Sequence, residues 1–540
     1  MLIKRILQLL LPDERRTGMK VAGAVFLSAM LDFVGLAVLL PVLYLLLDGG
    51  GQRQAALWFC LLAFGVIALK SIVAAMLSRY QQRFLLMLYK RLSSSLFDAY
   101  YHKGLLFIRE QGVSRLGHQV NFVCYAFSLN MLAPLLRIAG DSLLIALAII
   151  ALLVFDWVTA AILFISFLPF MLFYTIGIRK RLRTYGEQEL NARRKQARVV
   201  AETFGGFAEL EVNDGFNTMK EQFQEGLEQI TASRMKMERI SRMPMFLSEL
   251  AIIVGLTLLT VLGSGDIKAL IGVFAVAAFR LLPALRGILM GWTQIQNTVP
   301  SLQIIENGLA ETSPKETEEE TKLTFHKEIA INNLTYGYEA AAPVLDHFNC
   351  TIHKGEYIGF NGYSGVGKST LFNLLLGFLQ PQEGDVCIDG LPLTPQMQAA
   401  WLKNIGYVQQ DVFIFQGSLA ENIALGCKQA DEEKIKQILE QVCLHEWAAT
   451  LPQGLSTPMG EYGKRLSGGQ RQRIGIARAL YKEAEVILLD EATSALDNRT
   501  EMEINTMLAE LRQSYPGLTI MSIAHRESSL SYCDRIITID

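Results

Sequence analysis

Long apolar runs dominate the first 290 residues of the chain. Each run is about 20 residues long, which is what an α-helix needs to cross the hydrocarbon core of a bilayer. We therefore predict six membrane-spanning helices, near residues 21–47, 55–78, 129–154, 157–177, 245–262 and 268–290. Together they predict an all-α transmembrane domain over residues 1–310.

The segments between these runs show which ends of the helices lie in the cytoplasm. Residues 79–128 and 178–244 are long, polar and rich in arginine and lysine, so the second to fifth helices are predicted to project far out of the membrane. Basic loops stay in the cytoplasm. The N-terminal segment is also basic and predicts an amphipathic helix at the membrane surface. Both termini and both projections are therefore expected to be cytoplasmic.

The pattern changes at Glu311. Residues 311–323 are acidic and polar and include a proline, which is typical of a linker. From 324 to 540, strand-like apolar runs alternate with helical segments, a pattern that predicts an α/β domain. The expected fold class is multidomain, with a six-helix transmembrane domain followed by this α/β domain.

A phosphate-binding loop of the pattern G-x-x-x-x-G-K-S lies between an apolar run and a helical segment of the α/β domain. Its glycines let backbone N–H groups converge on phosphate at a helix N-terminus. The lysine neutralises the β- and γ-phosphates, and the first hydroxyl binds Mg²⁺. The predicted ATP-binding residues are Gly362, Ser364, Gly365, Gly367, Lys368, Ser369 and Thr370, with Ser369 also a Mg²⁺ ligand.

A second apolar strand, VILLDE at 486–491, ends in two carboxylates. We expect Asp490 to support Mg²⁺ and Glu491 to polarise the attacking water. Such a strand is common by itself. Together with the phosphate loop it predicts a nucleoside triphosphatase.

The run LSGGQ lies between these two motifs, and with it the domain resembles the P-loop ATPase domain of the ABC family. The resemblance implies that this segment, from a partner subunit, closes over the γ-phosphate of the bound ATP. A serine hydroxyl and backbone N–H groups at a helix N-terminus suit an anion. The residues concerned are Ser467, Gly468, Gly469 and Gln470.

Further family motifs follow in order along the chain. Tyr338 resembles the aromatic residue that stacks on adenine, with Tyr336 as the alternative. Gln410 resembles the glutamine that contacts Mg²⁺ and reports on the nucleotide, with Gln409 as the alternative. His525 resembles the histidine that touches the γ-phosphate, and the resemblance makes it catalytic with Glu491 and Gln410. Ser494 and Asp497, in SALD, resemble the loop that joins the two sites across a dimer.

The segment before LSGGQ resembles that of ABC exporters, which implies that Glu461 contacts the cytoplasmic loops of the membrane domain. Residues 109–117 and 204–212 are placed like the two coupling helices of that family. Fusion of six spans to one ATPase domain also favours an exporter over an importer.

Ionisable side chains inside membrane spans are costly and therefore functional candidates. Arg137 and Asp141 lie four residues apart and are expected to form an ion pair on one helical face. Asp32 and Lys70 can pair between the first two spans. Arg280 has no acidic residue nearby in its span, so it is a candidate for the substrate pathway, with helix packing or snorkelling as the alternative.

Composition supports a membrane protein and excludes other classes. Hydrophobic residues make up 51% of the chain and charged residues 19%, an apolar excess that a soluble protein does not need. The formal net charge of −2 produces no field that attracts nucleic acid, so no nucleic-acid partner is expected. The 7 cysteines are isolated, which argues against a disulfide framework or a zinc site.

The predicted function is an ATP-driven exporter or flippase that acts as a homodimer, uses ATP and Mg²⁺, and moves an amphipathic substrate by alternating access. The first and sixth spans resemble those of the bacterial lipid-linked oligosaccharide flippase subgroup, which implies a lipid-linked saccharide in the inner membrane. A peptide or drug exporter is the alternative within this class. A non-transporting ABC regulator or channel is the alternative from another class.

Overall fold

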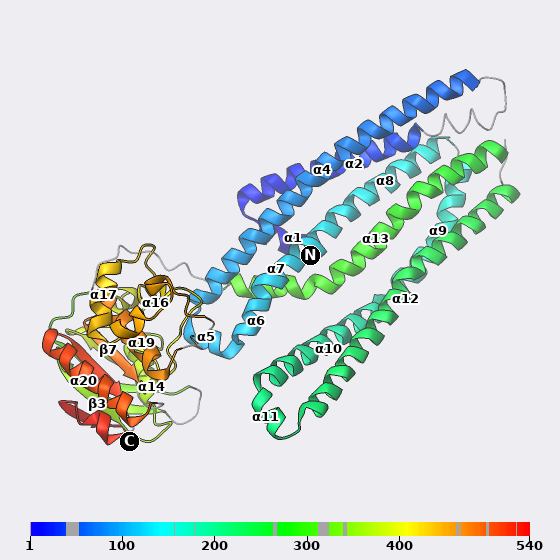
Figure 1. The fold of residues 1–540 in the computed structure, drawn as a ribbon. Helices are drawn as coiled ribbons and strands as arrows, with labels where there is room; N and C mark the ends of the chain where they lie inside the picture. The colour runs from blue at the N-terminus through cyan, green and yellow to red at the C-terminus, as the bar shows by residue number, and fades with distance from the viewer. Residues whose placement is uncertain are drawn as a thin grey trace. The chain divides into compact units, whose positions relative to one another are not determined.

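The computed structural model describes residues 2–38, 53–155, 157–177, 179–262, 267–310, 323–338, 343–460, 463, 466–492, 496–524 and 526–539. The chain divides into two compact units, Met1–Thr312 and Ser313–Asp540. Figure 1 shows that the first unit is helical and the second combines helices with sheets. This confirms the predicted fold class. The predicted linker, up to residue 322, lies outside the described residues.

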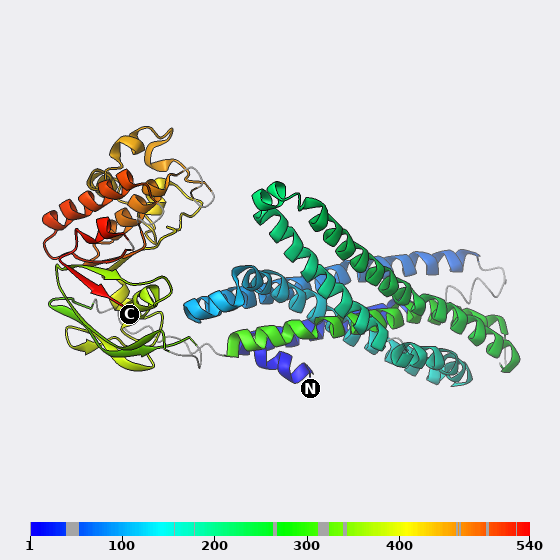
Figure 2. The ribbon, with the colours of Figure 1, turned by 90° about the horizontal axis from the view of Figure 1, so that it is seen from below.

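The helical unit is built from long helices joined by short turns. Helices α2, α4, α8 and α13 run side by side, and α10 packs along α12 (Figures 1 and 2). The bounds are α1 Leu2–Leu9, α2 Pro12–Ala37, α4 Arg53–His102, α5 Gly104–Gln111, α6 Val113–His118, η1 Gln119–Val123, α7 Cys124–Ala126, η2 Phe127–Leu132, α8 Ala133–Phe155, α9 Trp157–Gly177, α10 Arg179–Gly205, α11 Phe207–Val212, α12 Phe216–Leu262 and α13 Ile267–Ala310. Segments η1 and η2 are π-helical turns within one continuous helical path.

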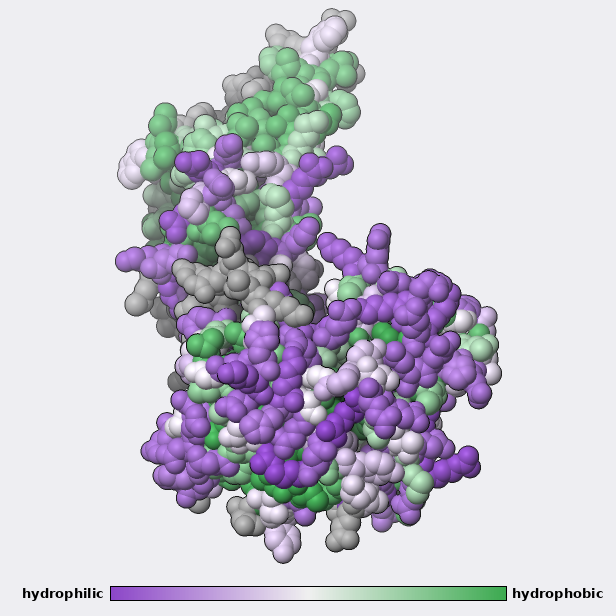
Figure 3. All heavy atoms as spheres, turned by 90° about the vertical axis from the view of Figure 1, so that its left-hand side faces the viewer, coloured by the Kyte–Doolittle hydropathy of each residue, from purple (hydrophilic) through white to green (hydrophobic). Residues whose placement is uncertain are grey.

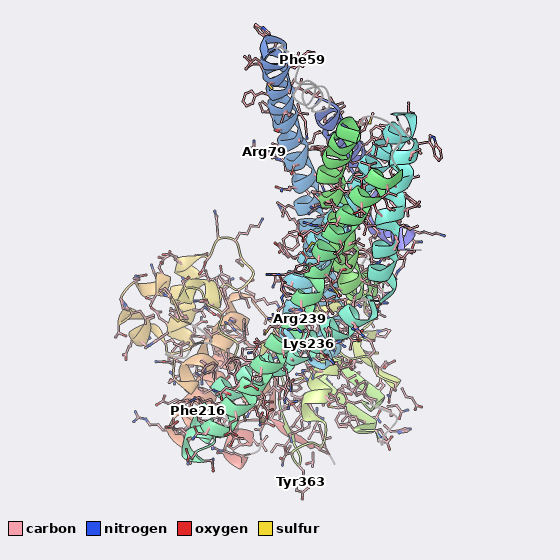
Figure 4. All side chains as sticks on the ribbon, turned by 90° about the vertical axis from the view of Figure 1, so that its right-hand side faces the viewer. Phe59, Arg79, Phe216, Lys236, Arg239 and Tyr363 are labelled. Carbon is pink, nitrogen blue, oxygen red and sulfur yellow. The ribbon has the colours of Figure 1, made fainter. Side chains whose placement is uncertain are left out.

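Apolar side chains cover one end of the helical unit and polar side chains the other (Figure 3). Among the described residues, three helical stretches are long and apolar enough to cross a membrane, at Pro12–Gly35, Leu57–His102 and Val113–Val154. The other predicted spans fall on α9, α12 and α13, in which some side chains are not described. Figure 4 shows Phe59 and Arg79 on α4, and Phe216, Lys236 and Arg239 on α12.

Helix α1 is amphipathic, because its apolar residues gather on one side and Lys4, Arg5 and Gln8 lie on the other. Ile6 and Leu10 are buried in the core of the helical unit, whereas Ile3, Leu7 and Leu11 are exposed. Apolar side chains exposed beside basic ones suit a helix that lies in a membrane interface.

Ion pairs neutralise the charges predicted within the first three spans. Lys70 Nζ lies 2.5 Å from Asp32 Oδ1, and Arg137 Nε lies 3.6 Å from Asp141 Oδ2. Both predicted pairs are confirmed. Gly35 makes the first pair possible, since a Cβ at this position would lie 3.1 Å from Lys70 Cδ.

The second unit contains two sheets. An antiparallel sheet has the strand order β2-β1-β4-β5, and a parallel sheet has the order β6-β7-β8-β3-β9. The strands are β1 Glu328–Tyr336, β2 Leu345–His353, β3 Tyr357–Asn361, β4 Glu383–Ile388, β5 Leu391–Pro392, β6 Ile405–Val408, β7 Val486–Asp490, β8 Thr519–Ile523 and β9 Arg535–Thr538. The helices are α14 Lys368–Leu375, α15 Gln398–Leu402, α16 Leu419–Ile423, α17 Glu432–Gln441, α18 His445–Ala449, α19 Gly468–Tyr481, α20 Asn498–Ser514 and α21 Glu527–Leu530, with a 3-10 turn η3 at Gly454–Ser456.

The parallel sheet is apolar because helices cover both of its faces. Residues 357–360, 486–489 and 519–523 are all buried. The register pairs Phe360 of β3 with Ile523 of β8, Ile523 with Asp490 of β7, and Leu489 with Val408 of β6. The segments that follow these strands therefore leave the sheet at the same edge.

The Asp32–Lys70 pair leads to a prediction about the helical unit. Asp32→Asn leaves the Lys70 ammonium without its counter-ion between two apolar helices, and we expect a cost of about 3 kcal/mol in stability. Thermal unfolding of the full chain in lipid nanodiscs measures this. The double variant Asp32→Asn, Lys70→Gln should recover most of the loss, and a double variant as unstable as the single one would contradict the pairing.

Candidate nucleotide-binding site

The phosphate loop connects β3 to α14 through glycines that no other residue replaces easily. Gly362, Gly365 and Gly367 have φ of 151°, 89° and 108°, a region that L side chains rarely adopt. A Cβ at Gly367 would lie 2.7 Å from Val344 Cγ1, and one at Gly362 would lie 2.5 Å from the carbonyl oxygen of Ile539. The loop thus presents its backbone at the N-terminus of α14, where N–H groups and the helix dipole favour an anion.

Lys368 is folded back over this loop. Its Nζ donates to the carbonyl oxygens of Gly362 at 2.7 Å and Tyr363 at 2.9 Å. Burial lowers the pKa of Lys368, against the opposing effect of Glu491 and Asp490 nearby. A phosphate group in the loop would favour the charged ammonium. Tyr363 itself points away into solvent (Figure 4) and is 87% exposed.

Two of the three residues predicted to hold Mg²⁺, Ser369 and Asp490, lie in contact. Ser369 Oγ donates to Asp490 Oδ1 at 3.0 Å. The other carboxylate oxygen, Oδ2, accepts from the hydroxyl of Tyr407 at 2.8 Å. Hydroxyl and carboxylate oxygens are ligands that Mg²⁺ prefers, so this pair fits the ion.

Glu491 lies directly after β7 in a left-handed conformation, with φ of 51°. Its N–H donates to the carbonyl oxygen of Ile523, the last residue of β8, at 3.2 Å. A non-glycine residue in this conformation stores strain, and such strain gathers at functional sites. The backbone therefore holds this carboxylate at the edge of the sheet where the phosphate loop also begins.

The structure separates the two candidates for adenine stacking. Tyr336 is buried, at 7% exposure, and packs edge-on against Tyr338. Tyr338 is 50% exposed, and its hydroxyl lies 3.0 Å from Thr370 Oγ1 in α14. Tyr338 is therefore the tyrosine whose ring is accessible to a base.

Gln409 and Gln410 follow β6, and both are exposed. Their carbonyl oxygens accept from Nε2 of Gln472, at 3.2 Å and 2.7 Å. Gln472 is buried in α19, the helix that follows LSGGQ. One side chain thus ties the segment after β6 to that helix.

Ser467 is the N-cap of α19. Its hydroxyl accepts from the N–H of Gln470 at 3.2 Å, and the Gln470 side chain accepts from the N–H of Ser467 at 2.9 Å. This capping box gives both residues a local structural role. Ser467 remains exposed, while a Cβ at Gly469 would lie 2.5 Å from Thr500 Cγ2.

Asp497 is the N-cap of α20. It accepts from the N–H of Thr500 at 3.1 Å and from its hydroxyl at 2.7 Å. Thr500 packs against Gly469. The first turn of α20, which follows the SALD segment, therefore contacts the LSGGQ segment of the same chain.

Other predicted residues fall where the structure gives no description. Glu461, Ser494 and His525 lie outside the described residues, and Arg280 lies in α13 with its side chain not described. Sequence reasoning in turn missed Tyr407 and Gln472. Each stands next to a recognised motif, Tyr407 three residues before Gln410 and Gln472 two residues after Gln470, but only the fold shows their partners.

Tyr407 supports a direct prediction. Tyr407→Phe removes one hydrogen bond to Asp490 but keeps the ring, so we expect the Mg²⁺ concentration for half-maximal ATPase activity to rise about 3- to 10-fold. Mg²⁺ titration of the ATPase rate measures this. Tyr481→Phe, at a tyrosine whose hydroxyl accepts from the N–H of Asp431, is the matched control. An unchanged Mg²⁺ dependence in Tyr407→Phe would contradict the role.

The chain resembles known proteins along most of its length. Residues 345–494 match the family model described as ABC transporter. An ATP-dependent lipid A-core flippase of Burkholderia thailandensis is 30% identical over 457 residues, which cover 82% of this chain and 75% of the relative. That of Burkholderia orbicola is 28% identical over 505 residues, covering 91% and 84%.

The fold leads to the same group. The structure of a bacterial Atm1-family ABC exporter with ATP bound superposes with a TM-score of 0.77 at 22% identity, covering 96% of this chain and 94% of that one. The chain therefore belongs to the ABC transporter family, as a multi-pass membrane protein in which ATP hydrolysis drives export or flipping of a substrate.

Proposed function

We propose that the chain acts as a homodimeric flippase for a lipid-anchored saccharide that bears phosphate or another anionic group. The observation that carries this proposal is a cavity of about 850 Å³ within the helical unit, lined by α2, α4, η2, α8 and α13. Its lining mixes apolar residues with polar and charged ones, including Asp32, Gln81, Gln82, Arg137, Asp141, Arg286 and Gln294. Such a lining suits an amphipathic molecule.

The arginines of this cavity are placed to receive an anion. The Arg137 side chain is 68% exposed although it pairs with Asp141. Gly287 leaves room for that pair, since a Cβ there would lie 2.2 Å from Asp141 Oδ2. Arg286 lines the same space from α13. Guanidinium groups bind phosphate with paired, charge-assisted hydrogen bonds.

The names of the relatives support the same substrate class. Several are ATP-dependent lipid A-core flippases, and lipid A-core is a lipid-anchored saccharide. The resemblance of the first and sixth spans to lipid-linked oligosaccharide flippases agrees with this class. We place the protein in a bacterial inner membrane, with the ATPase unit and both termini in the cytoplasm, as the basic loops imply.

The ATPase site supplies the driving force in this proposal. Bound Mg²⁺, held by Ser369, Asp490 and Gln410, would neutralise charge on the phosphates. Lys368 and the N–H groups of the loop bind the phosphates, and Tyr338 stacks on adenine. Glu491 accepts a proton from the attacking water, with His525 beside the γ-phosphate.

The second half of each site comes from the other subunit. The partner places Ser467, Gly468, Gly469 and Gln470 against the γ-phosphate, and Ser494 and Asp497 join the two sites. The exposure of Ser467 supports this arrangement. Closure of the two ATPase units turns the cavity outward, and hydrolysis resets it.

The movement of the ATPase units is transmitted to the membrane helices through the tips of the long cytoplasmic projections. Helix α11 exposes Phe207 at 65% and Val212 at 85%, which is apolar surface that a partner domain can cover. Glu461 is proposed to contact these cytoplasmic loops, and residues 109–117 and 204–212 act as the coupling segments. Arg280, also on α13, is proposed to contact the anionic group of the substrate along its pathway.

Glu491→Gln tests the ATPase mechanism. The variant keeps the shape of the side chain but cannot accept the proton, so we expect turnover to fall by at least about 100-fold while ATP binding persists. Phosphate release and retention of labelled ATP by the full chain in nanodiscs measure the two effects. Wild-type turnover in Glu491→Gln would contradict the proposed base.

Arg137→Gln and Arg286→Gln test the cavity. Loss of a charge-assisted hydrogen bond to phosphate should raise the concentration of lipid A-type glycolipid that half-maximally stimulates ATPase activity about 10-fold or more. Arg79→Gln is the matched control, because Arg79 lies on α4 (Figure 4) but not in the cavity lining. Stimulation by peptides or drugs, and not by glycolipid, would favour the alternative exporter classes.

A further inference from the structure

A buried carboxylate near the nucleotide site has no role in the mechanism above. Glu501 lies in the first turn of α20, and its side chain is only 3% exposed. It accepts hydrogen bonds from Arg526, from Ser529 and from Ser528 Oγ, the last at 3.0 Å. Burial by itself raises the pKa of Glu501, but hydrogen bonds from Ser529, Arg526 and Ser528 outweigh it and lower the pKa overall. The carboxylate is therefore ionised at neutral pH.

The guanidinium of Arg526 reaches a third segment. Its Nη1 also donates to the carbonyl oxygen of Leu496 at 3.3 Å and to Asn498 Oδ1 at 3.2 Å. One arginine thus joins the segment after β8, the segment 496–498 and the first turn of α20. The first of these segments follows β8, which ends at Ile523. The other two follow β7, which ends at Asp490.

The position of this cluster connects it to hydrolysis. Arg526 directly follows His525 in sequence, and Leu496 lies five residues after Glu491. The N–H of Glu491 is already bonded to the carbonyl oxygen of Ile523, and the N–H of Ala524 to that of Phe360. The backbone fixes the strand ends, and Arg526 joins the described residues Leu496, Asn498 and Glu501 that follow β7.

Stability alone does not account for such a pair. Removing two charges from water costs about as much as their attraction returns, so apolar replacements of a buried ion pair are often equally stable. Arg526 Nη1 does, however, bond to Glu501, Leu496 and Asn498 together, and so sets the relative geometry of these three residues. A shift of about 1 Å at a reacting group is enough to reduce a rate about 100-fold.

We propose that Glu501 and Arg526 are positioning residues for ATP hydrolysis, which lock the loops after β7 and β8 together so that Glu491 and His525 meet the γ-phosphate in register. The inference rests on the roles proposed above for Glu491 and His525. The pair itself touches neither nucleotide nor metal and acts through those two residues.

The test uses the full chain in nanodiscs. We expect Arg526→Gln and Glu501→Gln to lower kcat for ATP about 10- to 100-fold, with KM for ATP changed less than about 3-fold. Arg526→Lys, which keeps a charged nitrogen that can donate to Glu501, should restore part of kcat. Arg535→Gln is the matched control, because Arg535 pairs with Glu356 in the same unit and touches neither loop. It should keep wild-type kcat.

A double-mutant cycle separates positioning from mere stability. Part of the effect of Arg526 runs through His525, so Arg526→Gln should slow His525→Ala by a smaller factor than it slows the wild type. Multiplicative effects in the cycle would overturn the proposal. So would a loss of kcat in Arg535→Gln as large as that in Arg526→Gln, at an equal fall in melting temperature. Wild-type turnover in Glu491→Gln and His525→Ala would instead show that the roles assigned to those residues have failed.

Discussion

Parallel pairing of β3, β8 and β7 is the constraint on which the nucleotide site depends. Phe360, Ile523 and Asp490 lie in register across three adjacent strands. The phosphate loop, the carboxylates of Asp490 and Glu491 and the segment beginning at Ala524 therefore emerge at one edge of the sheet, although the loop lies more than a hundred residues before the other two in sequence. In open parallel sheets ligands bind beyond the carboxyl ends of the strands, since loops from different strands converge there.

Several of the predicted nucleotide-site residues carry out a structural task in addition to the one proposed for them. Ser467 and Asp497 both cap helices, and Lys368 holds the phosphate loop through its carbonyl oxygens. A helix N-terminus that is capped by its own side chain still has further N–H groups to offer an anion, because the first turn leaves several without intrahelical partners. The fold and the proposed function thus use the same helix ends.

The helical unit faces a different constraint, because charge in a membrane must be paired or used. Asp32 is paired with Lys70 between two helices, whereas Arg137 pairs with Asp141 and remains largely exposed toward a cavity. The Asp32–Lys70 pair is mostly shielded from solvent, so we interpret it as a structural pair. The second lies where an anionic headgroup can compete for the guanidinium, which is why it carries the substrate proposal.

Sequence alone determined the elements and the ATPase class of this protein. Apolar runs of membrane length and short motifs such as LSGGQ depend on residues that are close in the chain, so their meaning survives without coordinates. A spacing of four residues was likewise enough to predict the Arg137–Asp141 pair. The apolar surroundings of Asp32 and Lys70 were enough to predict that these two residues pair. Only the tertiary structure distinguished Tyr338 from buried Tyr336, placed Tyr407 on Asp490, and joined Glu501 to Arg526. These contacts cross between strands and helices far apart in sequence, and strand register and helix packing, which no local pattern encodes, decide them.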